Sequence, residues 1–237
     1  MSREKRDMST ETTRMSGILF DHGRTARIGL PEAVFCEGKS REAVAMLLEE
    51  HGKDTAKPIL FTRLDQDVFE SMPSAIREPY DYHPLSRTAY TAVLPRNSVG
   101  RVSVVSAGTA DGRVTWEAVR TLRYHGIDVV AYEDNGVAGL WRLTGNLDEI
   151  EAAYVIIVVA GLDAALASVM GGLTAKPLIA VPTSVGYGMA RNGEAALASM
   201  LVSCSPGVSV FNIDNGYGAA CAAARIINLI SKQCRPM

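Results

Sequence analysis

The sequence predicts an α/β protein with a doubly wound, mainly parallel sheet, preceded by a small α/β N-terminal region. Two apolar runs, Val155–Val159 and Leu178–Val181, are rich in β-branched residues and too short to be helices. Residues Ala164–Leu173 between them have helical character, so the stretch forms a strand–helix–strand unit. Both runs are apolar along their whole length, which is typical of a parallel sheet that is covered on both faces.

The same alternation of strand and helix continues on either side of this unit, from about residue 99 to residue 237. The expected strands are Val102–Val105, Asp128–Ala131, Val155–Val159, Leu178–Val181 and Val208–Ile213. The expected helices lie near Thr115–Tyr124, Leu140–Leu143 with Leu147–Ala152, Ala164–Leu173, Glu194–Val202 and Gly218–Ile230. This alternation defines the larger, C-terminal domain.

The residues before this domain are less regular. Residues 1–15 are polar without an apolar period, and we expect a disordered tail there, followed by an N-terminal region over residues 16–98. The expected elements of that region are a helix capped by Ser40 and ended by Gly52, a strand at Pro58–Thr62 and a short helix at Val68–Met72. We expect Tyr80–Thr88 to be irregular, either a linker packed on a neighbouring element or an arm that contacts substrate.

Composition and charge restrict the class of protein. The chain has 237 residues, 47% hydrophobic and 21% charged, with a net charge of −2, which argues against a dedicated nucleic-acid binder. Its four cysteines are irregularly spaced and form neither a disulfide framework nor a zinc pattern. The apolar stretch Ala152–Leu173 has Asp163 at its middle and is interrupted before the ~18–20 residues that a membrane span needs. We therefore expect a cytoplasmic protein that binds neither nucleic acid nor membrane.

The loops that follow the five expected strands carry the candidate site, because ligands of parallel sheets bind at the carboxyl ends of the strands. All five loops contain glycine, which lets the backbone approach a ligand, and helix N-termini offer free N–H groups to phosphate. Together they predict a small ligand that bears phosphate. The residues assigned to its binding are Ser106, Gly108, Thr109, Asp111, Gly161, Thr183, Ser184, Gly186, Tyr187, Asn212, Asp214 and Asn215.

The common signatures of nucleotide and ester chemistry do not account for these loops. The sequence has no G-x-x-x-x-G-K followed by Ser or Thr, and no G-x-G-x-x-G after the first strand. It also has no G-x-S-x-G, the nucleophile elbow of serine hydrolases.

The loop motifs SAGTAD, VAGLDAALASVMGGL, AVPTSVGYG, SC-x-x-G and VFNIDNGYGA, in this order, resemble those of the LarB family, the carboxylase-hydrolases of nickel-pincer nucleotide biosynthesis. The resemblance extends over about residues 20–230. Matching residues in the N-terminal region are Asp21, Arg24, Arg27, Gly29, Pro31, Glu32, Gly38, Lys39, Arg63, Ser86, Arg87 and Thr88. The C-terminal domain of that family in turn resembles the aminoimidazole ribonucleotide carboxylase of purine biosynthesis.

The resemblance implies a reaction. The family adds CO2 at position five of the pyridinium ring of nicotinic acid adenine dinucleotide and hydrolyses the phosphoanhydride, giving pyridinium-3,5-biscarboxylic acid mononucleotide and AMP. A cysteine thiolate adds to the ring at position four, which makes position five nucleophilic, and no biotin is needed. CO2 or bicarbonate is the co-substrate, and Mg2+ is expected at the pyrophosphate, with its ligands left open. The resemblance also implies a homo-oligomer of high order, with an octamer among the states it allows.

Particular residues inherit roles from the resemblance. Cys204 matches the family's cysteine, and Asp163 matches a glutamate in the family's V-A-G-M-E-G-A-L, as the proton acceptor. Each also has an ordinary interpretation, Cys204 as a small core residue and Asp163 as a favourable charge at a helix N-terminus. Candidate partners for carboxylate or phosphate are Arg24, Arg27, Lys39, Arg63 and Arg87. Cys221 is expected in the core, whereas Cys36 and Cys234 receive no role.

The sequence departs from the family at several positions. Asp163 stands where the family has a glutamate, and Trp141 stands where it has a histidine. Two other functions therefore stay open: an aminoimidazole ribonucleotide carboxylase or mutase, and a non-catalytic nucleotide-binding regulator. The cysteine and the N-terminal region exceed what the purine enzyme needs, and binding alone does not require a thiol. Both features favour the LarB-like interpretation.

Overall fold

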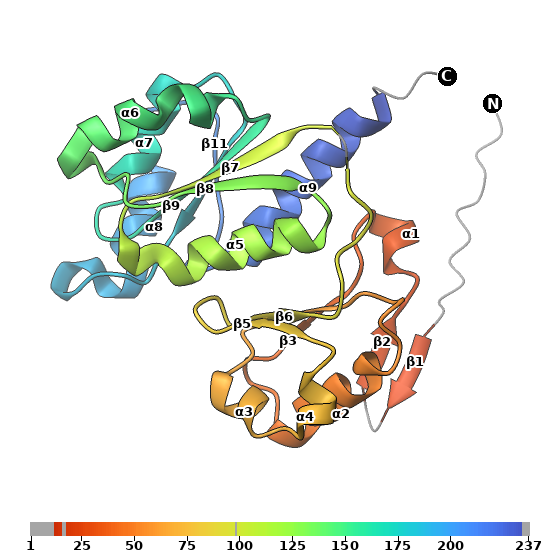
Figure 1. The fold of residues 1–237 in the computed structure, drawn as a ribbon. Coiled ribbons are helices and arrows are strands. Elements are labelled where there is room, and N and C mark those ends of the chain that lie inside the picture. The colour runs from red at the N-terminus through yellow and green to blue at the C-terminus, as the bar shows by residue number, and fades with distance from the viewer. Residues whose placement is uncertain (1–11, 16–17, 98, 234–237) are drawn as a thin grey trace.

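The structure is a computed structural model that describes residues 12–15, 18–97 and 99–233. The chain forms two α/β units, each built on its own sheet (Figure 1). The larger unit has a five-stranded parallel sheet in the order β11-β10-β9-β7-β8. Its strands are β7 (Arg101–Ser106), β8 (Asp128–Tyr132), β9 (Val155–Ala160), β10 (Leu178–Pro182) and β11 (Val208–Val210). The predicted fold class is confirmed.

Helices cover both faces of this sheet. Helices α5 (Gly112–Tyr124) and α9 (Gly216–Gln233) cover one face, and α6 (Leu140–Glu151), α7 (Ala165–Leu173) and α8 (Glu194–Leu201) cover the other. Within β9, Ile157 packs toward α5 and α9, whereas Ile156 and Val158 pack toward the opposite helices. Because successive side chains alternate between two buried faces, the whole strand is apolar.

Two expectations for this domain are corrected. The last strand ends at Val210 rather than Ile213, because the chain beyond Phe211 turns into a loop in which Asp214 has a φ of 59°. The two helical segments expected on either side of Gly145 are one helix, α6. Asn146, between the two expected segments, is helical and donates from its amide to Asn135 Oδ1 at 2.9 Å.

The smaller unit has a four-stranded sheet in the order β3-β4-β6-β5. Its strands are β3 (Ala33–Phe35), β4 (Leu60–Thr62), β5 (Asp81–His83) and β6 (Thr88–Tyr90), and its helices are α1 (Arg24–Ile28), α2 (Arg41–Gly52), α3 (Gln66–Glu70) and α4 (Ser74–Arg77). Ser40 caps α2 as predicted, since its hydroxyl accepts from the Ala43 N–H at 3.2 Å. The core of this unit lies between α2 and the sheet and includes Leu47, Leu48 and Phe61.

The N-terminal region contains more regular structure than expected. Tyr80–Thr88 is not irregular, because it contains β5 and the start of β6. The turn between them is held by Ser86, whose hydroxyl bonds His83 Nδ1 at 2.9 Å and Thr88 Oγ1 at 2.8 Å. Part of the expected tail is also ordered: β1 (Thr12–Met15) pairs antiparallel with β2 (Ile18–Asp21). The expectation for residues 1–11 falls outside the described residues.

The two units contact each other along α5. Arg120 on this helix is buried and donates to Thr88 Oγ1 at 2.9 Å and to Asp81 Oδ2 at 3.1 Å. Tyr124 donates to the Pro58 carbonyl at 2.9 Å and packs against Tyr90. No helix among residues 12–15, 18–97 and 99–233 is long and apolar enough to cross a membrane.

His125, at the end of α5, predicts an acid-dependent loss of stability. Burial lowers the pKa of this imidazole from 6.5 to about 4. As the pH falls from 6.5 to about 4, the imidazole is protonated in the unfolded chain but stays neutral in the folded chain. Up to about 3 kcal/mol of the free energy of unfolding is therefore lost over this range. Chemical denaturation of His125→Phe should show a smaller decrease across this range. An equal decrease in both proteins would assign the acid sensitivity to other groups.

Candidate functional site

The predicted loop residues meet at the carboxyl edge of the five-stranded sheet, which we call the rim. Asp111 ties three of the rim loops together. Its carboxylate is buried, accepts from Gly108 N at 2.9 Å and accepts from Thr183 Oγ1 at 2.6 Å. A side chain at Gly161 would come within 2.6 Å of Thr183 Oγ1, so only glycine fits this close approach. Asp111 thus holds the loops in place and is an internal tie, rather than a free ligand for substrate.

Asp214 is the second tie of the rim. One carboxylate oxygen accepts from Ser184 N at 2.9 Å, and the other accepts from Ser184 Oγ at 2.7 Å and from Arg113 Nη2 at 2.6 Å. Its main-chain carbonyl accepts from Arg63 Nη2 at 2.7 Å. Since Arg63 follows β4 of the smaller unit, this contact brings a guanidinium of the N-terminal region onto the rim.

Glu117 also takes part in the contact between Arg63 and the larger unit. It is buried on α5, accepts from the Tyr217 N–H at 3.2 Å at the start of α9, and lies 3.7 Å from Arg63 Nε. Burial raises the pKa of the Glu117 carboxyl, and the Arg63 charge opposes this shift. Glu37 bonds the other end of the guanidinium at 2.8 Å. Arg63 is therefore fixed between the two units.

Of the cationic side chains assigned from the sequence, Lys39 and Arg87 belong to the same part of the N-terminal domain as Arg63. Lys39 follows β3 close to Glu37, and Arg87 donates to the Arg63 carbonyl at 3.4 Å. Arg87 forms an ion pair with Asp65 of its own domain, while its Nε is buried and lacks a hydrogen-bond partner among the described residues. Arg63, Arg87 and Lys39 form what we call the basic cluster of the N-terminal domain.

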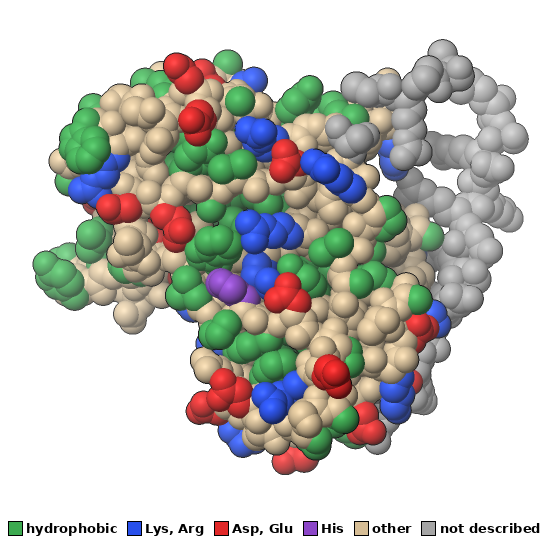
Figure 2. All heavy atoms as spheres, in the orientation of Figure 1, with side chains coloured by type: hydrophobic (Ala, Val, Ile, Leu, Met, Phe, Trp, Pro, Cys, Tyr) green, Lys and Arg blue, Asp and Glu red, His purple; other side chains and the backbone are tan. Residues whose placement is uncertain are grey.

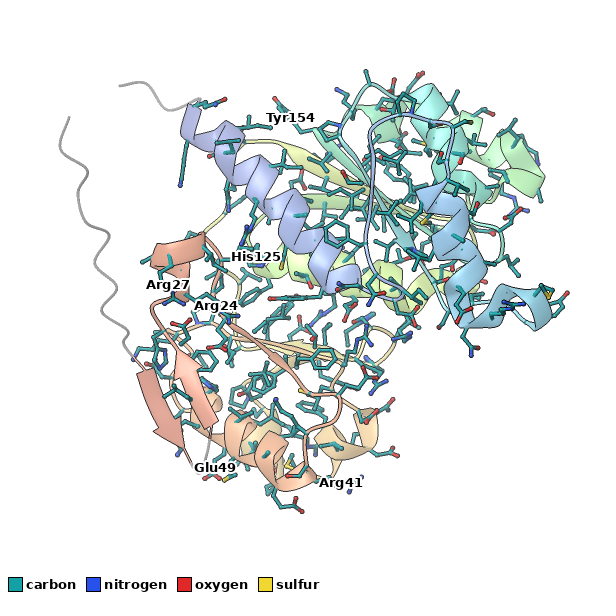
Figure 3. The ribbon with its side chains drawn as sticks, turned by 180° about the vertical axis from the view of Figure 1, so that it is seen from behind. Arg24, Arg27, Arg41, Glu49, His125 and Tyr154 are labelled. Carbon is teal, nitrogen blue, oxygen red and sulfur yellow. The ribbon has the colours of Figure 1, made fainter. Side chains whose placement is uncertain are left out.

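Arg24 and Arg27 have a different environment. Both belong to α1, which Figures 1 and 3 show on the opposite side of the molecule from η3 (Gly188–Gly193). Arg27 bonds Asp21 and holds the pKa of that carboxyl below its usual value, and Arg24 lies 3.8 Å from Glu32. In this chain these arginines are engaged with acidic side chains of their own domain and are not brought to the rim.

Strained backbone is concentrated around the rim and the basic cluster. Side chains other than glycine rarely adopt a positive φ, and such residues gather at functional sites. The residues with this conformation here are Arg63, Arg87, Asp134, Leu162, Ala164, Arg191, Asn192 and Asp214. Leu162 and Ala164 flank Asp163, so the loop after β9 holds that carboxylate in a strained turn. The Ser106 hydroxyl, at the end of β7, is buried without a partner among the described residues and is available to a ligand.

Arg191 offers a direct measure of this strain. It is exposed, with a φ of 47°. Arg191→Gly should raise the free energy of unfolding by about 0.5–1 kcal/mol, because relief of the left-handed conformation outweighs the added chain entropy of glycine. Glu49→Gly, in the helical backbone of α2, is the matched control and should lower it by about 1 kcal/mol. Chemical denaturation gives both values. A loss of stability in Arg191→Gly would contradict the assignment of strain.

Asp163 and Cys204 differ in their positions. Asp163 is exposed at the rim, and its Oδ1 accepts from Ala165 N at 3.3 Å. Cys204 is exposed in the loop between α8 and β11. Val208, just after this loop, pairs with Leu178 at the amino end of β10, whereas the rim follows the carboxyl end. A single chain therefore does not bring Cys204 into the rim.

Apolar side chains are exposed at both places. Next to Cys204, Leu201 and Val202 are 66% and 81% exposed. At the rim, Tyr187 and Met189 are 89% and 74% exposed on the segment that carries η3. Figure 2 shows apolar side chains covering the tip of this projecting segment. Exposed apolar surface of this extent is typical of an interface.

The rim carboxylates are poorly suited to hold a metal ion by themselves. Both oxygens of Asp111 and both oxygens of Asp214 already accept hydrogen bonds. No group of three His, Cys, Asp or Glu side chains in the described parts of the chain is arranged as a metal site. The donor set therefore does not fit a resident metal held by protein ligands alone.

Sequence reasoning missed Arg113, Glu117 and Arg120. Their spacing of four and three residues places them on one face of α5, and each makes a contact that joins rim loops or the two units. The spacing was visible in the sequence. The contact partners, which lie 32 to 101 residues away, were not.

Comparisons with known proteins agree with this arrangement. Residues 13–93 match the LarB/PurE-like N-terminal domain, and residues 101–236 match AIR carboxylase. The chain belongs to the LarB family. An uncharacterized protein of Methanocaldococcus jannaschii is 35% identical over 91% of this chain and 86% of its own length. The N5-carboxyaminoimidazole ribonucleotide mutase of the same organism is 32% identical over 54% of this chain and 79% of its own length. This LarB-like chain is thus a member of a carboxylase family with the added N-terminal domain.

Proposed function

We propose that this LarB-like protein carboxylates the pyridinium ring of nicotinic acid adenine dinucleotide at position five and hydrolyses its phosphoanhydride. The products are pyridinium-3,5-biscarboxylic acid mononucleotide and AMP, in nickel-pincer nucleotide biosynthesis. The observation that carries the proposal is the contact between Arg63 and the Asp214 carbonyl. It joins the basic cluster of the N-terminal domain to the rim of the carboxylase domain, so that an anionic dinucleotide can contact both.

The proposed chemistry uses a thiolate and a base. A pyridinium ring is too electron-poor to attack CO2. Addition of the Cys204 thiolate at position four gives a dihydropyridine whose position five attacks the carbon of CO2. Asp163 then takes the proton from position five, and the electrons of that C–H bond form the double bond between positions five and six. Expulsion of the thiolate from position four by the ring nitrogen restores the aromatic pyridinium. The thiol is regenerated, and no biotin takes part.

Because the two residues lie apart in one chain, we propose that a second copy supplies Cys204. Leu201 and Val202 beside the thiol and Tyr187 and Met189 at the rim are apolar and exposed, and the first pair follows α8, toward the amino end of β10, whereas the second pair follows its carboxyl end. Burial of one patch against the other in a homo-oligomer would place the cysteine of one subunit at the rim of the next. This arrangement gives every subunit one complete site.

Anion binding is assigned to the basic cluster. Arg63, Arg87 and Lys39 supply the positive charge for the carboxylate and the pyrophosphate, and the ligand would compete with Glu37 and Asp65, which pair with the two arginines. The Ser106 hydroxyl, which lacks a partner among the described residues, would contact the rest of the ligand. Mg2+, if required for hydrolysis, would arrive on the pyrophosphate, as is usual for this ion.

The alternative is a purine-type mutase, which the M. jannaschii mutase favours by its similarity to the C-terminal domain. That similarity leaves the N-terminal domain without a role. The uncharacterized relative matches across both domains, which indicates that the pair acts as a unit.

Product analysis separates these functions. The purified protein is incubated with nicotinic acid adenine dinucleotide and 13C-bicarbonate, and in parallel with N5-carboxyaminoimidazole ribonucleotide, followed by mass spectrometry. We expect a labelled pyridinium dicarboxylate and AMP from the first mixture and no conversion in the second. Arg63→Lys should weaken dinucleotide binding by about tenfold, because lysine cannot keep the contacts with both Glu37 and the Asp214 carbonyl that hold the two domains together at the rim. Conversion of only the purine substrate would overturn the proposal.

A further inference from the structure

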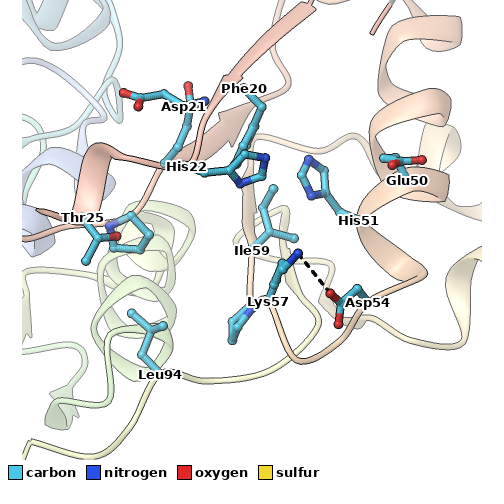
Figure 4. Close-up of a pocket in the computed structure, with 13 residues that line it drawn as sticks. Phe20, Asp21, His22, Thr25, Glu50, His51, Asp54, Lys57, Ile59 and Leu94 are labelled. Carbon is cyan, nitrogen blue, oxygen red and sulfur yellow. Dashed lines mark hydrogen bonds and ion pairs between the residues drawn. The ribbon is translucent and has the colours of Figure 1, made fainter. Parts of the chain in front are cut away.

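A cavity of about 670 Å3 lies in the N-terminal domain, apart from the rim (Figure 4). Its walls come from β2, α1, the end of α2, the segment before β4 and Leu94 of the linker between the units. Pro31 and Ile59 in its lining precede β3 and β4, whereas Arg63 follows the carboxyl end of β4. The cavity is thus at the amino ends of these strands, and its volume is typical of a small-molecule site.

Aromatic rings form one wall of the cavity. The Phe20 ring lies 5.0 Å from the His22 ring and 4.6 Å from the His51 ring, centroid to centroid. Figure 4 shows both imidazoles directed into the opening, with Ile59 and Leu94 completing the apolar surface. Such a wall suits a planar ring, which stacks on aromatic side chains and buries apolar area.

His51 supplies a polar atom inside the cavity. Its Nε2 is buried and has no hydrogen-bond partner among the described residues. Burial, with a smaller contribution from His22, lowers the pKa of His51, so the ring is neutral at neutral pH and its nitrogens can donate or accept. Buried polar atoms are nearly always paired, so a bound molecule is the natural partner for this one.

The charges at the cavity do not suit a phosphate. Asp21 and Glu32 line it, and the arginines that pair with them do not. Lys57 is the only lysine or arginine among the described lining residues, and it pairs with Asp54 at 3.5 Å.

We propose that this cavity binds a phosphate-free heteroaromatic compound of nucleoside size, with its ring on the wall of Phe20, His22 and His51 and a polar atom bonded to His51 Nε2. The site is independent of the function proposed for the rim. The ligand proposed for the rim is an anionic dinucleotide, whereas the ligand proposed here carries no phosphate, so one pair of probes distinguishes the two sites.

Adenosine and AMP are the probes, because they differ only by the phosphate. The full-length protein has four histidines, so imidazole NMR signals can be assigned by substitution. We expect adenosine to shift the His22 and His51 signals with a Kd on the order of 0.1 mM. AMP should shift them at least about tenfold more weakly, since its phosphate meets carboxylates. Unchanged signals at millimolar adenosine, or equal binding of AMP, would overturn the proposal.

Two variants test the position of the ligand by separate routes. His51→Phe keeps the ring and removes Nε2, and should weaken adenosine binding about fivefold to tenfold. Leu94→Trp should block the cavity while His51 remains. Val93→Trp is the matched control, because Val93 is 53% exposed and does not line the cavity. Undiminished binding by Leu94→Trp in folded protein would place adenosine elsewhere and overturn the assignment.

Discussion

Cys204→Ser is expected to lower carboxylation of nicotinic acid adenine dinucleotide by at least about 10³-fold, because no other step makes position five of the ring nucleophilic. The measurement is labelled product from 13C-bicarbonate by mass spectrometry. Cys221→Ser is the control and should keep most of the activity. Cys221 packs against the core between α5 and α9, where burial raises the pKa of its thiol to about 11. Full activity in Cys204→Ser would end the covalent mechanism.

A mixing experiment then tests which subunit supplies the thiol. Cys204→Ser and Asp163→Asn should each be nearly inactive alone. If the thiol comes from a second copy, exchange of subunits creates some sites that contain both native residues, so activity returns on mixing. Native mass spectrometry confirms the exchange. Exchange without recovered activity would place both residues in one subunit's site and contradict the second-copy arrangement.

The C-terminal fold was predictable because its signals are local and repeated. Ile156, Ile157 and Val158 are buried on alternating faces, and this double burial is what makes the run continuously apolar. The rim followed from the same pattern, since strands that are all parallel put their following loops on one edge. The differences were the end of the last strand, at Val210 rather than Ile213, and the union of two expected helical segments in α6.

The N-terminal domain was harder to predict for a physical reason. Its sheet strands have three residues each, which is too short for a period of two to stand out. They are stable because of tertiary contacts, such as Arg120 of α5 bonding Thr88 and Asp81. The sequence of Tyr80–Thr88 alone does not show these contacts with α5.

The candidate site shows the same division. Loop membership is local, and sequence could assign Asp111, Thr183 and Asp214 to the rim. The contact partners of a side chain cannot be assigned in this way. Arg63 donates to a carbonyl 151 residues away, whereas Arg24 and Arg27 pair with acidic residues of their own segment. Three arginines to which the sequence assigned the same role thus have different environments, which depend on the fold.

Asp163→Asn is expected to leave the thiol adduct intact and to lower formation of the dicarboxylate by about 10²–10⁴-fold, the usual cost of a lost general base. Asparagine keeps the size and an oxygen that can accept from Ala165 N, as Asp163 Oδ1 does at 3.3 Å, so the strained turn between Leu162 and Ala164 should persist. Adduct and product are measured separately, by intact-protein mass and by labelled carboxylate.

Asp163→Glu is the matched variant, because it restores the longer carboxylate of the family while keeping the charge, and it should retain activity. The two substitutions separate basicity from architecture. If Asp163→Asn loses the adduct as well as the product, the carboxylate serves binding or loop structure. If it keeps both, the base lies elsewhere on the rim. Only an adduct that forms and then stalls identifies Asp163 as the group that removes the proton from position five.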